Sequence, residues 1–283
     1  MGVRDLVIVS PQVNYLVPVE VLLDANGRSL GERFAICYES SALRFVNAPP
    51  PERTRRVARG WRAILVSANA GASSVPNRPA LLWASTEIAD LRARLGSPLV
   101  LEGSSASEAR LRALEQDGAL GQTDLLHIVS HGHASDAWGS EVWLALAEYD
   151  GSTLRPSERD GLLELGDLDR WNVPTRLVVL SSCWGGGNAA MHSEGAMGLG
   201  PGLVHAGARS VINCVLPVDD AASLRFMDYF YAALFEPRAR PCSIADALRE
   251  ARVKLRDYRA PDGSQPYRHP KFWGGFVLLG DAG

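Results

Sequence analysis

The sequence predicts an α/β fold with a mostly parallel, doubly wound central sheet. Short apolar runs recur along the chain, and between them lie longer segments with apolar residues at helical spacing. Several runs end at Gly-, Ser- or Pro-rich loops, and two end at a reactive residue next to glycine. Strands that alternate with helices in this way form a sheet covered by helices on both faces.

The composition is that of a globular protein with a large core. The 283-residue chain has 46% hydrophobic and 22% charged residues and a formal net charge of −3. This charge gives no basic footprint for nucleic acid, and we interpret the one basic run, residues 53–62, as a solvated face. No apolar segment reaches the length of a membrane span and no signal peptide pattern opens the chain. We therefore expect a cytoplasmic protein without nucleic-acid or membrane partners.

The first half of the chain divides into strands, helices and one hairpin. Asn26-Gly27 predicts a tight turn between two extended runs, of which residues 33–39 form the second arm. Ser105 with Glu108 predicts a capping box that opens a helix. The expected strands are 6–9, 63–68, 98–101 and 124–130, and the expected helices are 81–95 and 105–114.

The second half continues the alternation. Ser243 with Asp246 predicts the start of a helix, and residues 157–171 predict a loop with a short helix. The other expected elements are strands at 141–147, 176–181, 209–216 and 276–279 and helices at 196–205 and 221–234. We predict one domain over residues 1–283, in which residues 1–70 extend the sheet and residues 71–283 form its core.

Two strand ends carry the residues that indicate chemistry. Leu126-His127-Ile128-Val129-Ser130 ends at His131-Gly132, and Leu177-Val178-Val179-Leu180-Ser181-Ser182 ends at Cys183, with Gly185, Gly186 and Gly187 close behind. Parallel strands bring such residues to the carboxyl edge of the sheet, where active sites of open α/β sheets lie. His131 precedes Cys183 by 52 positions (183 − 131), close to the spacing of about 50 in caspase-type proteases.

These residues suit a cysteine protease. Cys183 is the expected nucleophile, and His131 is the expected base and later the acid for the leaving amine. Gly132 is expected to turn the chain sharply, so that its N–H and that of Cys183 bind the oxyanion, while Gly185 lets the substrate backbone approach. By strand alternation His127 shares a face with His131 but lies deeper, as a core histidine.

The other thiols and histidines predict no further site. Cys37 and Cys214 lie in apolar runs and are expected to be inert core residues, while Cys242 precedes a helix and is expected to be partly exposed. His133 is interpreted as a loop histidine without a role. The histidines and Cys183 lack the spacing of a zinc motif, so we predict no metal and no cofactor.

In order and spacing, these strings resemble the CHAT domain, the caspase-like peptidase fold related to separases, over almost the whole chain. The supporting strings are Leu6-Val7-Ile8-Val9 with Leu16-Val17-Pro18, the His131 and Cys183 segments, Glu194-Gly195 with Gly198-Leu199, Ala206-Gly207-Ala208-Arg209-Ser210-Val211-Ile212, Val215-Leu216-Pro217-Val218-Asp219-Asp220, and Phe272-Trp273 with Phe276-Val277-Leu278. One departure is Leu216, where the family often has Trp. The resemblance implies a caspase-like three-layer α/β/α sandwich.

The resemblance also implies a function. It implies a cysteine endopeptidase that cuts a specific protein substrate in bacterial signalling or antiphage immunity, for example a gasdermin-like effector. Family members often carry helical repeats, for which this chain has no room, so regulation is expected from a partner in trans or from the chain's own loops. In separases an acidic position that matches Asp219 and Asp220 binds a basic residue before the scissile bond. Alternatively these aspartates are helix N-caps, and both interpretations stay open.

Other functions are weighed against the protease. An α/β-hydrolase elbow needs Gly two positions before and after the nucleophile, but Ser181 holds the first position, and the base would have to be His205 or His269. A catalytically silent scaffold that binds a partner through the same groove is the other alternative. For a basic-P1 enzyme, Arg155, Arg159 and Arg170 are expected self-cleavage sites.

Overall fold

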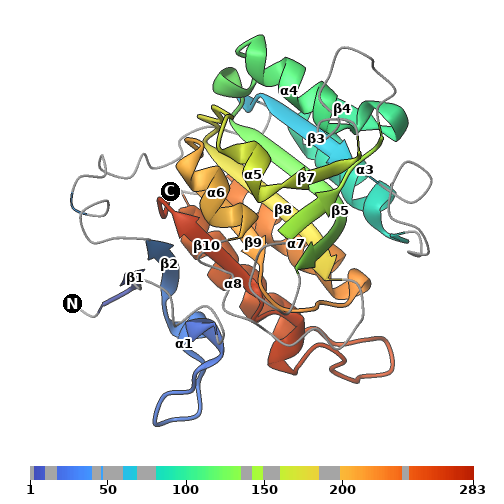
Figure 1. Ribbon diagram of the computed structural model, residues 1–283. Coiled ribbons are helices and arrows are strands. Elements are labelled where there is room, and N and C mark those ends of the chain that lie inside the picture. Colours follow the sequence, from blue (N-terminus) through green and yellow to red (C-terminus); the bar gives the residue numbers. More distant parts are fainter. Residues whose placement is uncertain are drawn as a thin grey trace.

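The computed structural model describes residues 3–9, 18–39, 46, 60–68, 81–134, 142–148, 160–184, 198–237 and 242–283, with the backbone alone at Ala134, Cys183 and Trp184. In these ranges the chain forms a three-layer α/β/α sandwich, with a central sheet between two layers of helices (Figure 1). This is the architecture that the sequence predicts.

The central sheet has ten strands within the described residues. They are β1 (Asp5–Val9), β2 (Ala35–Glu39), β3 (Ala63–Ser67), β4 (Leu99–Glu102), β5 (Leu125–Ala134), β6 (Val142–Ala145), β7 (Leu162–Glu164), β8 (Leu177–Trp184), β9 (Ser210–Cys214) and β10 (Phe276–Gly280). Their order is β1-β2-β10-β9-β8-β5-β3-β4, and β6 and β7 continue from the end of β5. β9, β8, β5, β3 and β4 are parallel, whereas β10 runs antiparallel to β9 and parallel to β2. The sheet is therefore mostly parallel, as predicted.

Helices cover both faces of this sheet. One layer contains α3 (Ala84–Leu95), α7 (Asp220–Phe235) and α8 (Ile244–Arg256). The other contains α4 (Glu108–Gln116), α5 (Leu165–Leu168) and α6 (Leu199–His205). The remaining described elements are α1 (Leu30–Arg33), η1 (Val19–Val21), η3 (Gly103–Ser105), η4 (Leu120–Gln122) and η7 (Pro270–Phe272). No helix among the described residues is both long enough and apolar enough to cross a membrane.

The continuous apolar runs of β5 and β8 arise because both strand faces are buried. Val129 and Val179 belong to the core on the α3/α7/α8 side, and Ile128 and Val178 belong to the core on the α4/α5/α6 side. Strands buried on both faces lose the polar alternation of half-exposed strands. Alternation along each strand therefore assigns odd-numbered residues of β5 and β8 to the α3/α7/α8 side.

Two helix starts test the capping predictions. The Ser243 hydroxyl accepts the N–H of Asp246 at 3.0 Å, so the predicted start of α8 is confirmed. The predicted capping box at Ser105 is wrong, because Ser107 caps α4 and accepts the N–H of Arg110 at 3.2 Å. Ser105 instead lies in η3 and donates to the carbonyl of Glu102.

The predicted turn at Asn26-Gly27 exists, and Leu23 and Ser29 beside it form an isolated antiparallel bridge, but the predicted second arm at residues 33–39 is wrong. Gly27 has φ 73°, and Asp24 Oδ1 accepts the N–H groups of Asn26 and Arg28. After the turn, Ser29 and Glu32 form a capping box that starts α1. The following strand, β2, then pairs in parallel with β1 instead of folding back on the run before the turn.

β1 and β2 extend the sheet beyond β10, and a buried ion pair fixes this part of the chain to α8. Arg252 Nη2 lies 3.2 Å from Glu20 Oε1 and donates to the carbonyl of Phe276 at 2.6 Å. The Tyr38 hydroxyl donates to Glu20 Oε2 at 2.6 Å. β3 lies within the first 70 residues but pairs with β5 and β4, so β1 and β2 alone extend the sheet.

Candidate active site

His131 and Cys183 occupy directly opposed positions on neighbouring strands. β5 and β8 pair in parallel from Leu125↔Leu177 to Gly132↔Trp184, and His131 is the register partner of Cys183. Neighbouring strands lie about 4.8 Å apart, and register partners in a parallel pair share a face of the sheet. The strand register therefore brings both expected catalytic positions together at the carboxyl edge, on the face covered by α3 and α7.

His131 lies in a closely packed setting at this edge. Its side chain is buried, and the adjacent Ser130 and Ser182 are buried as well. The Ser130 hydroxyl donates to the His131 carbonyl at 3.3 Å. These contacts limit the backbone freedom of His131 and so restrict the positions that its imidazole reaches.

The sharp turn expected at Gly132 is wrong. β5 continues to Ala134, and Gly132 pairs with Trp184 of β8 and with Leu144 of β6. A Cβ on Gly132 would lie 3.3 Å from the Ser182 hydroxyl oxygen and 3.4 Å from the Ser182 Cβ. Glycine at this position therefore gives Ser182 room on the neighbouring strand. An oxyanion role for Gly132 stays a prediction, and Gly185 lies outside the described residues.

His127 is a core histidine, as predicted. Its Nδ1 lies 2.8 Å from the Tyr231 hydroxyl, and its Nε2 lies 2.9 Å from Glu87 Oε1. We assign the proton to Nε2, which faces the Glu87 carboxylate in a close contact that is not oriented as a hydrogen bond, and let Nδ1 accept the hydroxyl of Tyr231. Burial raises the pKa of Tyr231 well above its ordinary value, so this hydroxyl keeps its proton.

Glu87 is a buried residue near the site that the sequence interpretation did not single out. It lies in the first turn of α3, on the buried side that also contains Ala84, Ile88 and Leu91. A charged residue within an apolar helical stripe was the available signal, because buried charges need a partner. His127 of β5, on the sheet face that α3 covers, is that partner.

His133 lies in β5 rather than in a loop. Its ring stacks on Trp143 of β6 with centroids 4.9 Å apart, and the two residues are cross-strand partners. Strand alternation places His133 on the same face as His131. The stacked pair therefore flanks the candidate site.

Asp219 and Asp220 follow β9, which pairs with β8 as the sequence interpretation required. Asp219 caps α7, and its carboxylate accepts the N–H of Ala222 at 3.0 Å. Asp220 Oδ2 accepts the N–H of Trp83 at the start of α3, at 3.3 Å. Burial is the main cause that raises the Asp220 pKa; the Trp83 N–H opposes it, whereas the nearby Glu87 charge adds to it. The N-cap interpretation is confirmed for Asp219, and a substrate pocket at either residue stays a prediction.

The other thiols do not compete with Cys183 as nucleophiles. Cys37, Cys214 and Cys242 are buried and form no disulfide among the described residues, so the expected partial exposure of Cys242 is wrong. Burial is the main cause that raises the Cys37 pKa, to about 12. Within the described residues, no group of three or more His, Cys, Asp and Glu side chains is arranged to hold a metal ion.

The downstream bases of the hydrolase alternative lie away from this pair. His205 is exposed in the last turn of α6, in the helix layer opposite α3 and α7. His269 caps η7, and its Nδ1 accepts the N–H of Lys271 at 3.1 Å. The histidine in register with Cys183 is upstream of it, which disfavours the hydrolase order. Of the expected self-cleavage residues, Arg170 is exposed after α5, whereas Arg155 and Arg159 lie outside the described residues.

Comparison with known proteins identifies relatives in sequence and in fold. The chain is similar to tetratricopeptide repeat protein 28, with 30% identity over 125 residues of the mouse protein and 23% over 320 residues of the human protein. These matches cover 44% and 98% of this chain but 5% and 12% of the relatives, so the chain spans a small part of their length.

Solved structures show the same fold at low identity. The complex of the pro- and mature domains of RgpB from Porphyromonas gingivalis aligns with a TM-score of 0.58 and 12% identity, over 99% of this chain and 65% of that one. The separase–securin complex of Saccharomyces cerevisiae aligns with a TM-score of 0.50 and 13% identity, over 88% of this chain and 14% of that one. The fold is therefore caspase-like. The CHAT domain model matches residues 1–281, and the chain belongs to the CHAT domain family.

Proposed function

We propose that this chain is a cysteine endopeptidase with His131 and Cys183 as its catalytic pair. In this mechanism His131 takes the thiol proton, and the Cys183 sulfur attacks the scissile carbonyl carbon. The C–N bond breaks when His131 returns the proton to the leaving amine, which leaves a thioester. Water then hydrolyses the thioester and restores the thiol.

One observation carries this proposal: the register pairing of His131 with Cys183 on adjacent strands. Two residues 52 positions apart in sequence (183 − 131) meet at the one edge where an open parallel sheet presents its site. The burial of the other described cysteines and the separate engagement of His127 leave this pair as the candidate.

The substrate class follows as a further part of the proposal. We expect a specific protein, cut after Arg or Lys, with Asp220 rather than Asp219 as the acidic residue that receives the basic side chain. Asp219 is committed to its helix cap, whereas Asp220 is half-buried and uses one oxygen on the Trp83 N–H. The biological setting that we propose is bacterial signalling or antiphage immunity, supported by the family resemblance alone.

A catalytically silent scaffold is the second candidate function. The contacts of Asp219 and Asp220 favour it, because a helix cap and a hydrogen bond to the Trp83 N–H account for both carboxylates without a substrate. It predicts partner binding that is unchanged when Cys183 is replaced.

The experiment is cleavage of a fluorogenic peptide library sorted by the residue before the scissile bond. Cys183→Ala and His131→Ala are each expected to lower kcat/KM at least about 10³-fold, because each removes a member of the pair. Cys242→Ala is the matched control, since it removes a buried thiol away from the sheet edge and keeps activity. Equal cleavage by wild type and Cys183→Ala would refute the assignment, and cleavage after acidic or apolar residues would refute the basic preference.

A further inference from the structure

A row of alternating cations and aromatic rings lies beside the candidate site, outside the catalytic pair. It begins on α7 and α8, where the Arg225 guanidinium lies 4.3 Å from the centroid of the Tyr258 ring. Lys254 Nζ lies 6.0 Å from the centroid of Tyr229, and Arg225 opposes the burial that raises the pKa of that tyrosine. Arg225, Tyr229 and Lys254 make the helical part of the row, and Tyr258 joins it to the loop after α8.

The loop after α8 makes the other part. The ring centroids of Tyr258 and Tyr267 are 5.5 Å apart, and those of Tyr267 and Phe272 are 5.4 Å apart. Lys271 Nζ lies 4.7 Å from the Phe272 centroid. We call this set of contacting side chains the cation–aromatic row. Its members are Arg225, Tyr229, Lys254, Tyr258, Tyr267, Lys271 and Phe272.

The charges of the row are available to a partner. Arg225, Lys254 and Lys271 form no ion pair with a carboxylate in the described part of the chain, and neither do the neighbouring exposed Arg259 and Arg268. The whole chain has a net charge of −3, so this concentration of positive charge is local. A cationic surface on an acidic protein attracts an acidic partner to that place.

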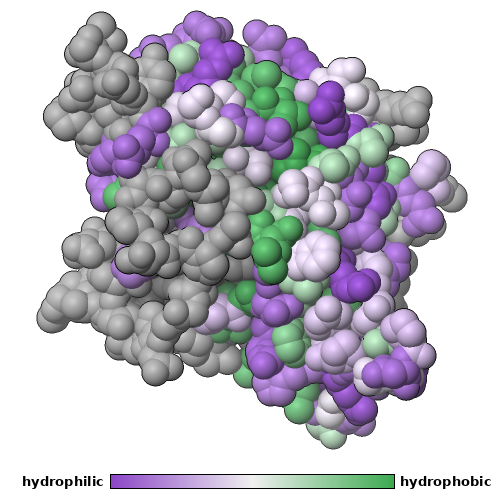
Figure 2. All heavy atoms as spheres, turned by 90° about the vertical axis from the view of Figure 1, so that its right-hand side faces the viewer, coloured by the Kyte–Doolittle hydropathy of each residue, from purple (hydrophilic) through white to green (hydrophobic). Residues whose placement is uncertain are grey.

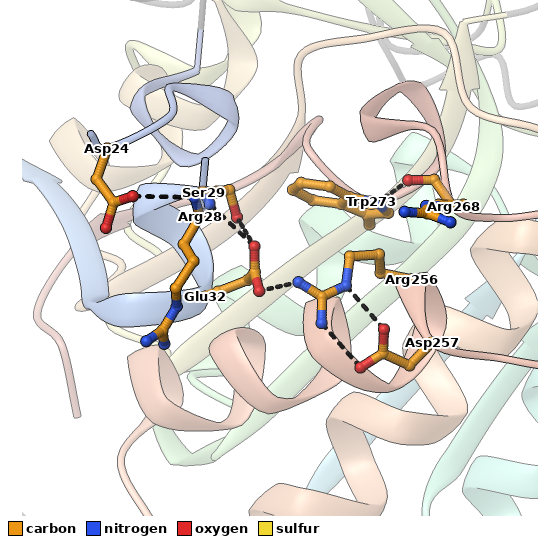
Figure 3. A network of polar contacts seen from close by, with 8 residues as sticks. All are labelled: Asp24, Arg28, Ser29, Glu32, Arg256, Asp257, Arg268 and Trp273. Atoms are coloured by element: carbon orange, nitrogen blue, oxygen red, sulfur yellow. Dashed lines mark hydrogen bonds and ion pairs between the residues drawn. The ribbon is translucent and has the colours of Figure 1, made fainter. Parts of the chain in front are cut away.

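Two nearby carboxylates, Glu32 and Asp257, are already paired with Arg256, and Asp262 in the loop accepts the N–H of Ser264. Figure 3 shows Arg256 between Glu32 of α1 and Asp257, with an ion pair to each. The hydrogen bond and charge of Arg256 lower the Asp257 pKa, and the charges of Arg259 and Arg268 lower it further. The positive field at this loop therefore exceeds what its own acids neutralise.

The loop is held in place before any partner arrives. The same ion pairs fix its first residue to α1 and α8. Near its end, buried Trp273 donates its ring N–H to the Arg268 carbonyl at 3.4 Å, as Figure 3 shows. A surface that is ordered in advance loses less entropy on binding.

The row is next to the edge that carries the catalytic pair. The loop ends at Gly275, whose carbonyl accepts the N–H of Val215 at 2.8 Å, directly after β9. Arg225 follows Asp220 by five residues of α7, about 7.5 Å along the helix axis. In Figure 2, the lower part of the face that is on the right of Figure 1 is mainly hydrophilic, at the level of this loop.

We propose that the cation–aromatic row, together with the exposed Arg259 and Arg268 that follow Tyr258 and Tyr267, is a docking surface for an acidic segment of the protein substrate, distinct from the residues around the scissile bond. Its use in cleavage rests on the proposed protease function, but the binding itself does not. A peptide fits better than single-stranded nucleic acid, because Arg225 and Lys271 already lie over the faces of Tyr258 and Phe272, which bases would otherwise stack on. Carboxylates reach the cations at the rim of the row without displacing any ring.

Binding is tested first, without catalysis, by fluorescence anisotropy on the Cys183→Ala chain. The probe is a fluorescein-labelled peptide of four Glu-Glu-Gly repeats, with a Gln-Gln-Gly peptide as the neutral control. We expect binding of the acidic probe alone, and weaker binding at higher salt. The triple variant Arg259→Glu/Arg268→Glu/Lys271→Glu is expected to raise Kd about tenfold or more.

The matched control is Arg92→Glu/Arg110→Glu/Arg170→Glu, which makes the same change in net charge at three other exposed arginines. An equal loss of affinity in both triple variants, or in neither, would overturn the proposal. Tighter binding of a twelve-nucleotide oligo(dT) that depends on the same three residues would also overturn it, in favour of a nucleic-acid surface.

Cleavage then links the surface to the site. A short substrate with the acidic peptide attached is expected to show a lower KM than the short substrate alone, with kcat unchanged, and the Arg259/Arg268/Lys271 variant is expected to lose that difference. Probe binding without any cleavage would refute the protease and keep the docking surface. Cleavage that ignores the acidic extension would refute the docking role and keep the protease.

Discussion

Gly132 explains how two strands meet closely beside the catalytic positions. It has strand partners on both sides, Trp184 in β8 and Leu144 in β6. The nearest atoms to its missing Cβ belong to Ser182 on one side and to Leu144, at 3.6 Å, on the other. The glycine after His131 is therefore a packing requirement of the sheet, in addition to any role at the oxyanion.

Gly132→Ala is expected to destabilise the fold by about 1–3 kcal/mol, because the added methyl group overpacks a site between two paired strands. Urea unfolding followed by circular dichroism measures the change. Gly166→Ala is the control: nothing lies within 4 Å of the position that its added methyl group would take in α5, so the free energy of unfolding is expected to hold or rise. Equal stability of the two variants would contradict this account of Gly132.

At the scale of elements, Asp220 joins the first turns of α3 and α7. Its carboxylate belongs to α7 and accepts the N–H of Trp83, the N-cap residue of α3. Asp219 satisfies the start of α7 itself, so consecutive aspartates serve two different helices. The join fixes the helix layer that covers the face shared by His131 and Cys183.

The Asp220 link predicts a pH effect. Burial raises the pKa of Asp220 above its ordinary 3.8, so the folded chain binds this proton more tightly than the unfolded chain. Its contribution to stability is therefore full below pH 3.8 and is lost as the pH rises through the folded-state pKa. Asp220→Asn removes this loss, so its stability relative to wild type is expected to rise between about pH 4 and pH 7.

Asp220→Ala separates titration from hydrogen bonding in the same unfolding series. It shares the pH trend of Asp220→Asn but is expected to be less stable throughout, because the Trp83 N–H loses its acceptor. A stability difference between Asp220→Asn and wild type that stays constant over this pH range would rule out the titration of Asp220.

The strands and helices show where local sequence suffices. Apolar runs and periodic stripes predicted the central strands and α3, α7 and α8. These elements are buried on one or both faces, and such burial requires apolar residues at a spacing that can be read within the element itself. The end of β5 was not predictable in this way. β5 continues past His131 because β6, the next strand along the chain, supplies an antiparallel partner for Gly132 and His133, and strand pairing depends on packing that the residues of one strand do not show by themselves.

The candidate site was predictable for a different reason. His131 and Cys183 each end an apolar run. Counted from Leu125 and Leu177, the two runs are equally long, so a parallel pairing that aligns their first residues also makes His131 and Cys183 register partners. Glu87 and the stacking of His133 on Trp143 depend on which helix and which strand pack there. The packing of α3 and β6 against β5 is set by the tertiary arrangement, so the sequence signals for these contacts were weaker than those for the catalytic pair.

At the scale of the whole molecule, Arg252 and Glu20 connect the two ends of the described chain. Both side chains are fully buried; the Tyr38 hydroxyl donates to Glu20 and Arg252 Nη2 donates to the Phe276 carbonyl, whereas Arg252 Nε and Nη1 have no hydrogen-bond partner within the described residues. Burial raises the pKa of Glu20, an effect that the Arg252 charge opposes. Burial likewise lowers the pKa of Arg252, so an ionisable pair lies at a costly position in the interior where β2, β10 and α8 meet.

Arg252→Met is expected to lower the free energy of unfolding by about 3–5 kcal/mol, because it leaves Glu20 buried without its cation. The double variant Glu20→Gln/Arg252→Met removes both charges and is expected to recover most of that loss. Urea unfolding of the four members of the cycle gives the coupling energy. Additive effects of the two single changes would show that the pair does not stabilise the fold as a unit.

The order of the sheet has a consequence for the time course of folding. β2 is synthesised early, but its β10 neighbour arrives late, and Glu20 waits for a partner 232 positions further along the chain. Contacts this distant close slowly, because the intervening chain must be ordered before they form. The central parallel strands have much nearer partners, so they are positioned to assemble as the ribosome releases them. The first strands to be made are thus among the last to dock, and until then the β10 edge of the sheet stands open to chaperones.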